Sequence, residues 1–340
     1  MTAAFSPSSA GTGPRRGPEP DARSLAVPAP SFFIVGAPGC GTTFMHEHLR
    51  VHPRIFMPEL KEPSYFCTDL DSGTPADGLI FTRDLDAYLA LFRPARDGQI
   101  AGEASPFYLY STDAAERIAA FRPDARIIIM LRDPADMIRY LHARRYFVGS
   151  EDIERFEDAL AAEPARKRGE RLPPDAWNVK GLYYREVGRY AGQVGRYFAL
   201  FPSERIKVII FEEFRSDPSG TYSDVLRFLG VEPHQDLPSQ QVNPSLGVRS
   251  PRLHRLLLTP ILRKGFRRIA SLRLRKVARS LIERVNATPQ RPPFDPALRV
   301  QLQAEFRTDV ERLEGLIGRN VASIWYGSSS HIQRPLPPPS

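Results

Sequence analysis

The residues most clearly suited to chemistry lie in a glycine-rich segment, GAPGCGTT, at positions 36–43. Its three glycines allow a tight turn whose backbone N–H groups can point at one anion. Thr42 and Thr43 would add hydroxyls at the start of the next helix, where backbone amides also attract phosphate. The segment therefore predicts a phosphate cradle, although a turn without a ligand also fits the segment taken alone.

This loop lacks the lysine that a Walker A nucleotide loop carries at position 42, where the chain has Thr42. A P-loop kinase that uses ATP and Mg²⁺ would need that lysine and a strand-end aspartate, so kinase activity is disfavoured. Arg132 ends a strongly apolar run in the sequence LRDP, a placement that suits bidentate binding of an oxyanion. A surface arginine at a strand end is the alternative interpretation of Arg132.

Three histidines, His46, His48 and His52, lie in or just after the helix predicted to follow the loop. Their spacing is compatible with a metal site, but His52 precedes Pro53, a sequence typical of the end of a helix. Structural roles are favoured for all three, and we predict no bound metal.

Composition narrows the class of protein. The chain has 340 residues with 42% hydrophobic and 25% charged residues, a normal globular balance, and its formal net charge of +8 favours an anionic ligand. No apolar stretch reaches about 18 residues, which predicts no transmembrane segment. Cys40 and Cys67 cannot form a disulfide framework, and without a signal-peptide pattern we expect a cytoplasmic location. No nucleic-acid-binding motif is present, so we predict no nucleic-acid partner.

Short apolar runs alternate with helical patterns, which predicts an α/β fold with a mostly parallel sheet flanked by helices. The strands are expected at 31–36, at the start of 100–110, at 126–134 and at 205–214, and a long helix at 182–202. Residues 151–180 are charged and proline-rich and are interpreted as an insertion or lid. Residues 1–30 and 328–340 have the composition of disordered ends.

The segments that follow the loop are HPRIFMPELKEPSYF, GEASPFYL, IIIMLRDPADMIRYLHARRYF and FPSERIKVIIFEEFRSDPSGTYSDVLRFLGV. In this order and spacing the chain resembles the sulfotransferases that use 3′-phosphoadenosine 5′-phosphosulfate (PAPS), in their carbohydrate-type and bacterial branch. The resemblance covers about residues 31–326 and implies one sulfotransferase domain, 31–327, with a P-loop-type three-layer sandwich. It also implies metal-free transfer of a sulfuryl group to a hydroxyl, or an amine, of a small-molecule, lipid or glycan acceptor.

The resemblance also assigns roles to residues. Glu62 matches the general base, and Arg132 and Tyr140 occupy the positions of the 3′-phosphate ligands. Arg291, the first residue of RPPF and the end of the loop that precedes it, is a further expected 3′-phosphate contact. The expected phosphosulfate ligands are Gly36, Ala37, Pro38, Gly39, Cys40, Gly41, Thr42 and Thr43. The remaining candidates for the pocket are Glu103, Ser105 and Tyr108.

The chain departs from the family pattern at several of these positions. The catalytic lysine of the family falls on Gly39, its serine on Tyr140, and a lysine of some relatives on Ala104. Ser64 and Cys67 replace the histidine and aspartate of other relatives. A catalytically impaired protein that binds a nucleotide or an anionic glycan is therefore the alternative function.

A basic stretch at 249–284 carries arginines and lysines interleaved with leucine and isoleucine at helical spacing. An amphipathic helix with a solvated face is the favoured interpretation. A cleft wall for an anionic acceptor, or a peripheral contact with a membrane surface, are the alternatives. The oligomeric state is left open.

Overall fold

The computed structural model describes residues 21–22, 27–72, 81–173, 177–233, 247–248, 287–288 and 294–327. The basic stretch 249–284, Arg291, the segment 328–340 and most of the segment 1–30 lie outside the described residues, so the predictions for them stay predictions. Within the described part, no helix is both long and apolar enough to cross a membrane.

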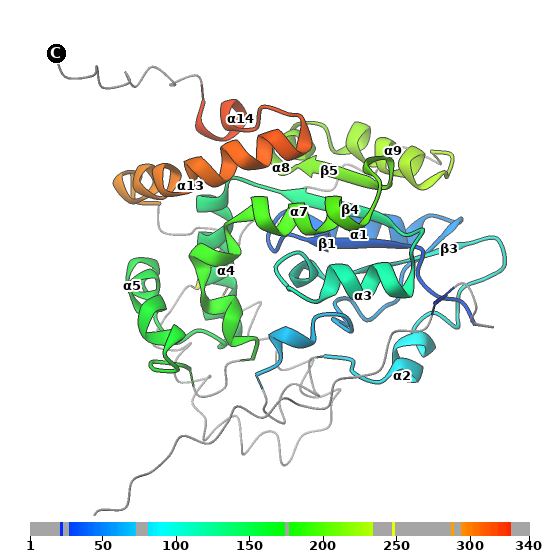
Figure 1. Cartoon of the computed structure of the whole chain (residues 1–340), viewed down its shortest axis with the longest axis horizontal. Coiled ribbons are helices and arrows are strands. Elements are labelled where there is room, and N and C mark those ends of the chain that lie inside the picture. Colours follow the sequence, from blue (N-terminus) through cyan, green and yellow to red (C-terminus); the bar gives the residue numbers. More distant parts are fainter. Residues whose placement is uncertain are drawn as a thin grey trace, which may run out of the picture.

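A five-stranded sheet forms the centre of the molecule, in the order β2-β3-β1-β4-β5 (Figure 1). All of its neighbouring strands pair in parallel, so the predicted α/β fold is confirmed. β1 and β4 are almost entirely buried, as expected for strands covered on both faces. The strands are β1 (Phe32–Gly36), β2 (Ile55–Phe56), β3 (Ile100–Ala104), β4 (Arg126–Leu131) and β5 (Ile206–Ile210).

Helices cover both faces of this sheet, which gives the predicted three layers. α1 (Thr42–Val51) and α9 (Pro218–Leu229) are neighbours, because the Tyr222 hydroxyl donates to the His48 carbonyl over 3.1 Å. α3 (Ala114–Phe121) packs against α7 (Tyr190–Leu200), and both lie in front of the sheet in Figure 1. The chain runs from β1 towards β2 at one side of the sheet, and from β3 towards β4 at the other side. Because both crossovers are right-handed, the helices that follow β1 and β3 lie on opposite faces of the sheet.

The other elements complete this frame. α13 (Pro296–Ile317) packs against α7 and α4, and a separate antiparallel pair joins β6 (Gly247–Val248) to β7 (Ala287–Thr288). The remaining helices are α2 (Leu85–Ala90), α4 (Pro134–Val148), α5 (Phe156–Lys167), α6 (Tyr184–Val187), α8 (Phe211–Ser216) and α14 (Ala322–Tyr326). The short 3₁₀ turns are η2 (Thr68–Leu70), η4 (Pro106–Tyr108), η5 (Val179–Leu182) and η6 (Ser203–Arg205).

The single long helix predicted at 182–202 is wrong, because the segment is divided into η5, α6 and α7. The break falls at Gly188, where the Phe306 ring of α13 and Ile138 of α4 approach so closely that a Cβ would lie 2.8 Å from the ring. The Gln193 side-chain amide donates to the backbone carbonyls of Glu186, Val187 and Arg189 at this break. Tertiary packing thus overrides a helical pattern.

Two other segments contain helices that the sequence patterns did not predict. Within 151–180, residues 156–167 form α5, which a buried ion pair between Glu151 and Arg166 ties to the body of the protein. The strand predicted at 205–214 ends at Ile210, and α8 starts at the next residue. Apolar runs do not distinguish a buried strand from a short buried helix, which explains the second error.

Candidate functional site

The glycine-rich loop lies at the carboxyl edge of the sheet, between β1 and α1. The Ala37 amide donates to the Met130 carbonyl of β4 over 2.6 Å, which fixes the start of the loop. Beyond it, no amide from Gly39 to Phe44 donates to any group of the described residues. Gly41 is the N-cap of α1 at φ 89° and provides no side-chain cap. The loop and the helix start therefore present a run of open donors, an arrangement suited to an anion.

The side chains of the loop differ in their access to a ligand. Thr43 is exposed, whereas Thr42 is buried with only 3% of its surface exposed. The Cys40 thiol is completely buried, donates to the Pro38 carbonyl over 3.5 Å, and has its pKa raised to about 12 by burial. Cys40 is thus a neutral packing residue, and any ligand contact at that position comes from its amide.

Gly39 and Tyr140 are in direct contact, although they are far apart in the sequence. Gly39 has φ 73°, and a Cβ built on it would overlap the Tyr140 ring, with Cε1 and Cγ both 2.9 Å away. The structure therefore brings the loop after β1 and the helix after β4 together at these two residues.

Arg132 follows β4 directly, at the same edge of the sheet as the loop. Its side chain is 18% exposed. The guanidinium carbon lies 4.9 Å from the Phe211 ring centroid, and one guanidinium nitrogen lies 3.9 Å from an Asp136 carboxylate oxygen. Its Nε is buried and has no hydrogen-bond partner among the described residues. An arginine with an unused donor beside an amide cradle is suited to hold a phosphate.

The C-terminal helices reach this edge through Asp133, a residue that sequence reasoning did not assign to the site. Asp133 caps α4 by accepting from the Ala135 amide over 2.9 Å, and it also accepts from Gln303 and Arg299 of α13 at 2.9 and 3.2 Å. Burial and the neighbouring Asp136 raise the pKa of Asp133. The signal that could have found the cap is the Asp-Pro pair at the start of a helical pattern.

Glu212 links the same edge to α14. Its carboxylate accepts from the Trp325 indole N–H over 2.9 Å and from the Asp133 amide over 3.4 Å, and burial raises its pKa. The described part of the C-terminal region therefore supports the strand end that carries Arg132. No local sequence pattern predicts such a contact between distant segments.

Glu62 lies beside β3 at this edge, because its amide donates to the Ala104 carbonyl over 3.1 Å. Glu62 and Ser64 both have positive φ values, 61° and 54°, which are unusual for residues with side chains and cost of order 1 kcal/mol or more each. The Ser64 amide donates to the Ser105 hydroxyl over 3.1 Å and holds this turn. The Glu62 carboxylate is 43% exposed and pairs with Lys61, so it remains accessible.

The predicted pocket residues Glu103, Ser105 and Tyr108 do not line an open pocket. They are at most 1% exposed, and Glu103 accepts hydrogen bonds from Ser105 and from Tyr88. Burial raises the pKa of Glu103 to about 7. These residues form a closed polar cluster beneath the edge of the sheet.

The three histidines have structural contacts. His46 pairs with the Pro58 carbonyl at 3.2 Å, His48 with the Phe44 carbonyl at 2.8 Å, and His52 with the Glu232 carbonyl at 3.3 Å. Each ring therefore bonds a backbone carbonyl, which fits the structural roles favoured from the sequence.

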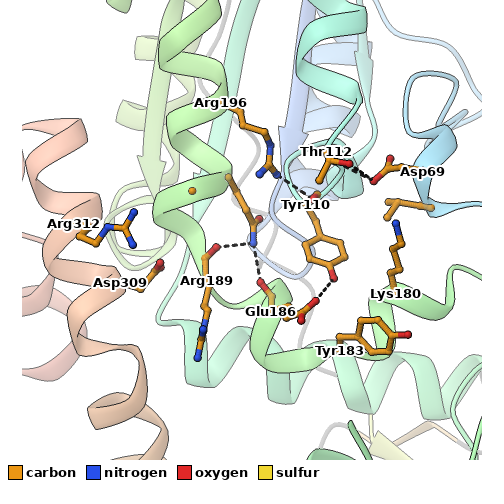
Figure 2. Close-up of a pocket in the computed structure, with 13 residues that line it drawn as sticks. Asp69, Tyr110, Thr112, Lys180, Tyr183, Glu186, Arg189, Arg196, Asp309 and Arg312 are labelled. Atoms are coloured by element: carbon orange, nitrogen blue, oxygen red, sulfur yellow. Dashed lines mark hydrogen bonds between the residues drawn. The ribbon is translucent and has the colours of Figure 1, made fainter. Parts of the chain in front are cut away.

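A cavity of about 400 Å³ lies elsewhere, between η2, α6, α7 and α13 (Figure 2). Most of its polar lining groups bond one another. Asp69 accepts from the amide and hydroxyl of Thr112, Tyr110 donates to Glu186 over 3.1 Å, and Arg196 donates to two backbone carbonyls. Neither the loop nor Glu62 lines this cavity, so it is not part of the anion site.

The fold and the loop together define the class of protein: a parallel α/β sandwich of the P-loop type with an oxyanion cradle between β1 and α1. A family model described as "Sulfotransferase family" matches residues 30–236, more than half of the chain, and the chain belongs to this family. α13 and α14 lie beyond the matched residues.

Individual relatives agree with this assignment. The chain is 29% identical to human heparan sulfate glucosamine 3-O-sulfotransferase 3B1 over 208 residues, which cover 60% of this chain and 46% of the relative. It is 28% identical to mouse bifunctional heparan sulfate N-deacetylase/N-sulfotransferase 4 over 211 residues, 60% of this chain and 23% of the relative. The alignments thus span less than half of these curated relatives.

A solved sulfotransferase structure from Alicyclobacillus acidocaldarius is similar over a larger part of the chain. It is 33% identical, with a TM-score of 0.64, and the match covers 88% of this chain and 100% of that one. The family and fold implied by the sequence resemblance are therefore confirmed.

Proposed function

We propose that this protein is a PAPS-dependent sulfotransferase that transfers a sulfuryl group to a hydroxyl of a small-molecule, lipid or glycan acceptor, with an amine as a less favoured acceptor. Family membership supports the reaction class, and the heparan sulfate relatives support a glycan among the acceptors. The observation that carries the proposal is the run of amides from Gly39 to Phe44 beside the Arg132 Nε, all of which lack a hydrogen-bond partner among the described residues.

These groups fit the donor because PAPS is rich in oxyanions. The amides of the loop and the Thr43 hydroxyl would hold the phosphosulfate, and Arg132 would hold the 3′-phosphate. When bound, PAPS would supply the sulfuryl group that the acceptor receives, with 3′,5′-adenosine bisphosphate as the leaving group. Binding to fixed backbone donors needs little reorganisation, which is the main contribution that a protein makes to this kind of group transfer.

Glu62 would act as the general base. A carboxylate held at the edge of the sheet and still accessible can accept the proton that an acceptor hydroxyl loses. The strained turn at residues 62–64 indicates that the position of this carboxylate is constrained by the surrounding structure.

The alternative function is binding without turnover, and the specific observation in its favour is the glycine at position 39 in place of a cation. Two measurements separate the alternatives. Calorimetric titration with 3′,5′-adenosine bisphosphate tests the nucleotide site, and incubation with PAPS and a panel of hydroxylated acceptors tests transfer by mass spectrometry. Binding with transfer supports the proposal, binding without transfer supports the alternative, and absence of binding contradicts both.

A further inference from the structure

The contact between Gly39 and Tyr140 joins the two elements that form the anion site. Tyr140 belongs to α4, which begins directly after the strand-end segment that carries Arg132. Gly39 lies in the middle of the loop that presents the open amides. One side chain therefore spans from the helix after β4 to the loop after β1.

The contact leaves no room for a side chain at position 39. A Cβ there would lie 2.9 Å from two atoms of the Tyr140 ring and closer still to Cδ1, a separation that folded proteins essentially never show. The φ of 73° at Gly39 is also in the left-handed region that favours glycine. Glycine at 39 and a ring at 140 are therefore sterically complementary.

The ring also constrains the loop itself. A hydrogen bond fixes the loop at Ala37, and among the described residues the next bonded amide is that of Met45, which donates to the Gly41 carbonyl over 3.1 Å. Between these two points the backbone amides form no bond within the described residues, so packing must hold the loop in place. Tyr140 packs on one side at Gly39, and the Phe214 ring packs beside Gly41, 2.9 Å from where a Cβ would be.

We propose that Tyr140 is the positioning residue of the loop: its ring occupies the space of a side chain at position 39 and holds the amides in the arrangement that receives an anion. That the loop binds an anion rests on the proposed function, whereas the effect of the ring on the position of the loop does not. The ring, rather than the hydroxyl, performs this role. The two departures from the family pattern, at 39 and 140, are then a single coupled change.

The first test measures the affinity of the full-length protein for 3′,5′-adenosine bisphosphate by calorimetry. Tyr140→Ala removes the packing that holds the loop amides in place, so Kd should rise by about tenfold, the scale of the interaction free energy between contacting residues. Tyr140→Phe keeps the ring and should stay within about twofold of wild type. Arg144→Ala, an exposed position on the same helix, is the matched control and should leave Kd unchanged. A wild-type Kd in Tyr140→Ala, or equal losses in the Phe and Ala variants, would overturn the inference.

The second test is a double-mutant cycle. Gly39→Ala should weaken binding in the presence of the ring, and the loss in Gly39→Ala/Tyr140→Ala should be smaller than the product of the single losses. Strictly multiplicative losses would contradict the proposed coupling. For the same reason Gly39→Lys alone should bind more weakly than Gly39→Lys/Tyr140→Ser, which provides the space that the lysine needs.

The third test does not depend on the ligand. Hydrogen–deuterium exchange of the Ala37 and Met45 amides, whose hydrogen bonds to the Met130 and Gly41 carbonyls hold the two ends of the loop, should become faster in Tyr140→Ala than in wild type and in Arg144→Ala, with the melting temperature little changed. If wild type fails to bind the nucleotide, the proposed function fails, but faster exchange would still support the positioning role. Unchanged exchange in a folded Tyr140→Ala would overturn it.

Discussion

The loop at the edge of the sheet and the closed polar clusters of the protein differ in whether their polar groups have hydrogen-bond partners. From Gly39 to Phe44 the loop leaves its donors open within the described residues. At Glu151, by contrast, two guanidinium bonds from Arg166, the Tyr184 hydroxyl and two backbone amides surround one fully buried carboxylate.

Open donors are suited to an external anion, and closed ones to a fixed internal structure. Residue type alone therefore does not identify a functional site in this chain. Glutamates at positions 62, 103 and 151 differ in role because of what surrounds each carboxylate. Variants on the open side should change chemistry or binding, whereas variants on the closed side should change stability.

The largest expected effect lies on the open side. Glu62→Gln should lower the rate of sulfuryl transfer by about 10²–10⁴-fold, because the amide cannot accept the proton of the acceptor. Nucleotide affinity and melting temperature should change little, since the side chain is 43% exposed. Glu59→Gln, an exposed position in the same segment, is the matched control. Full transfer activity in Glu62→Gln would exclude Glu62 as the base.

On the closed side, Glu151→Gln should destabilise the protein by about 3–5 kcal/mol, because it leaves the buried Arg166 cation without its counter-charge. Burial raises the pKa of Glu151, but the Arg166 bonds outweigh burial and hold it below the ordinary value. The pair therefore stabilises the protein above the ordinary pKa of glutamate and loses this contribution as pH falls through the lower folded-state pKa. Urea unfolding at several pH values measures both effects, and a loss below about 1 kcal/mol would contradict the description.

The two sides of this comparison differ in how far the sequence predicts them. The strands β1, β3 and β4 and the loop could be predicted, because short apolar runs and glycine spacing are local signals. The assignment of Glu103 to an open pocket was wrong, because the exposure of a residue depends on which distant parts of the chain cover it. Asp133 and Glu212 were not assigned, since their partners Arg299 and Trp325 come from helices near the other end of the chain.

The Glu103 cluster should produce a pH dependence of the opposite sign from Glu151. Burial raises the pKa of Glu103 to about 7, above the ordinary value of 4.5. Its contribution to stability is therefore fully present below pH 4.5 and is lost as pH rises towards 7, by at most about 3 kcal/mol. Glu103→Gln should remove this part of the pH dependence, which thermal melts between pH 4.5 and 8 would measure. A wild-type slope in the folded variant would contradict the assignment.

The smallest expected effect returns to the open side, at Arg132. Arg132→Lys keeps the positive charge but loses the planar donor pair, so Kd for 3′,5′-adenosine bisphosphate should rise by about tenfold with little change in stability. Arg126→Lys is the matched control, because Arg126 lies at the opposite end of the same strand, where it donates to the Leu229 carbonyl over 3.1 Å. An equal loss in both variants would show that strand stability, rather than the anion site, is affected. An unchanged Kd in Arg132→Lys would mean that the unpartnered Nε is not used by the ligand, and that the open amides bind the nucleotide without a geometric contribution from this arginine.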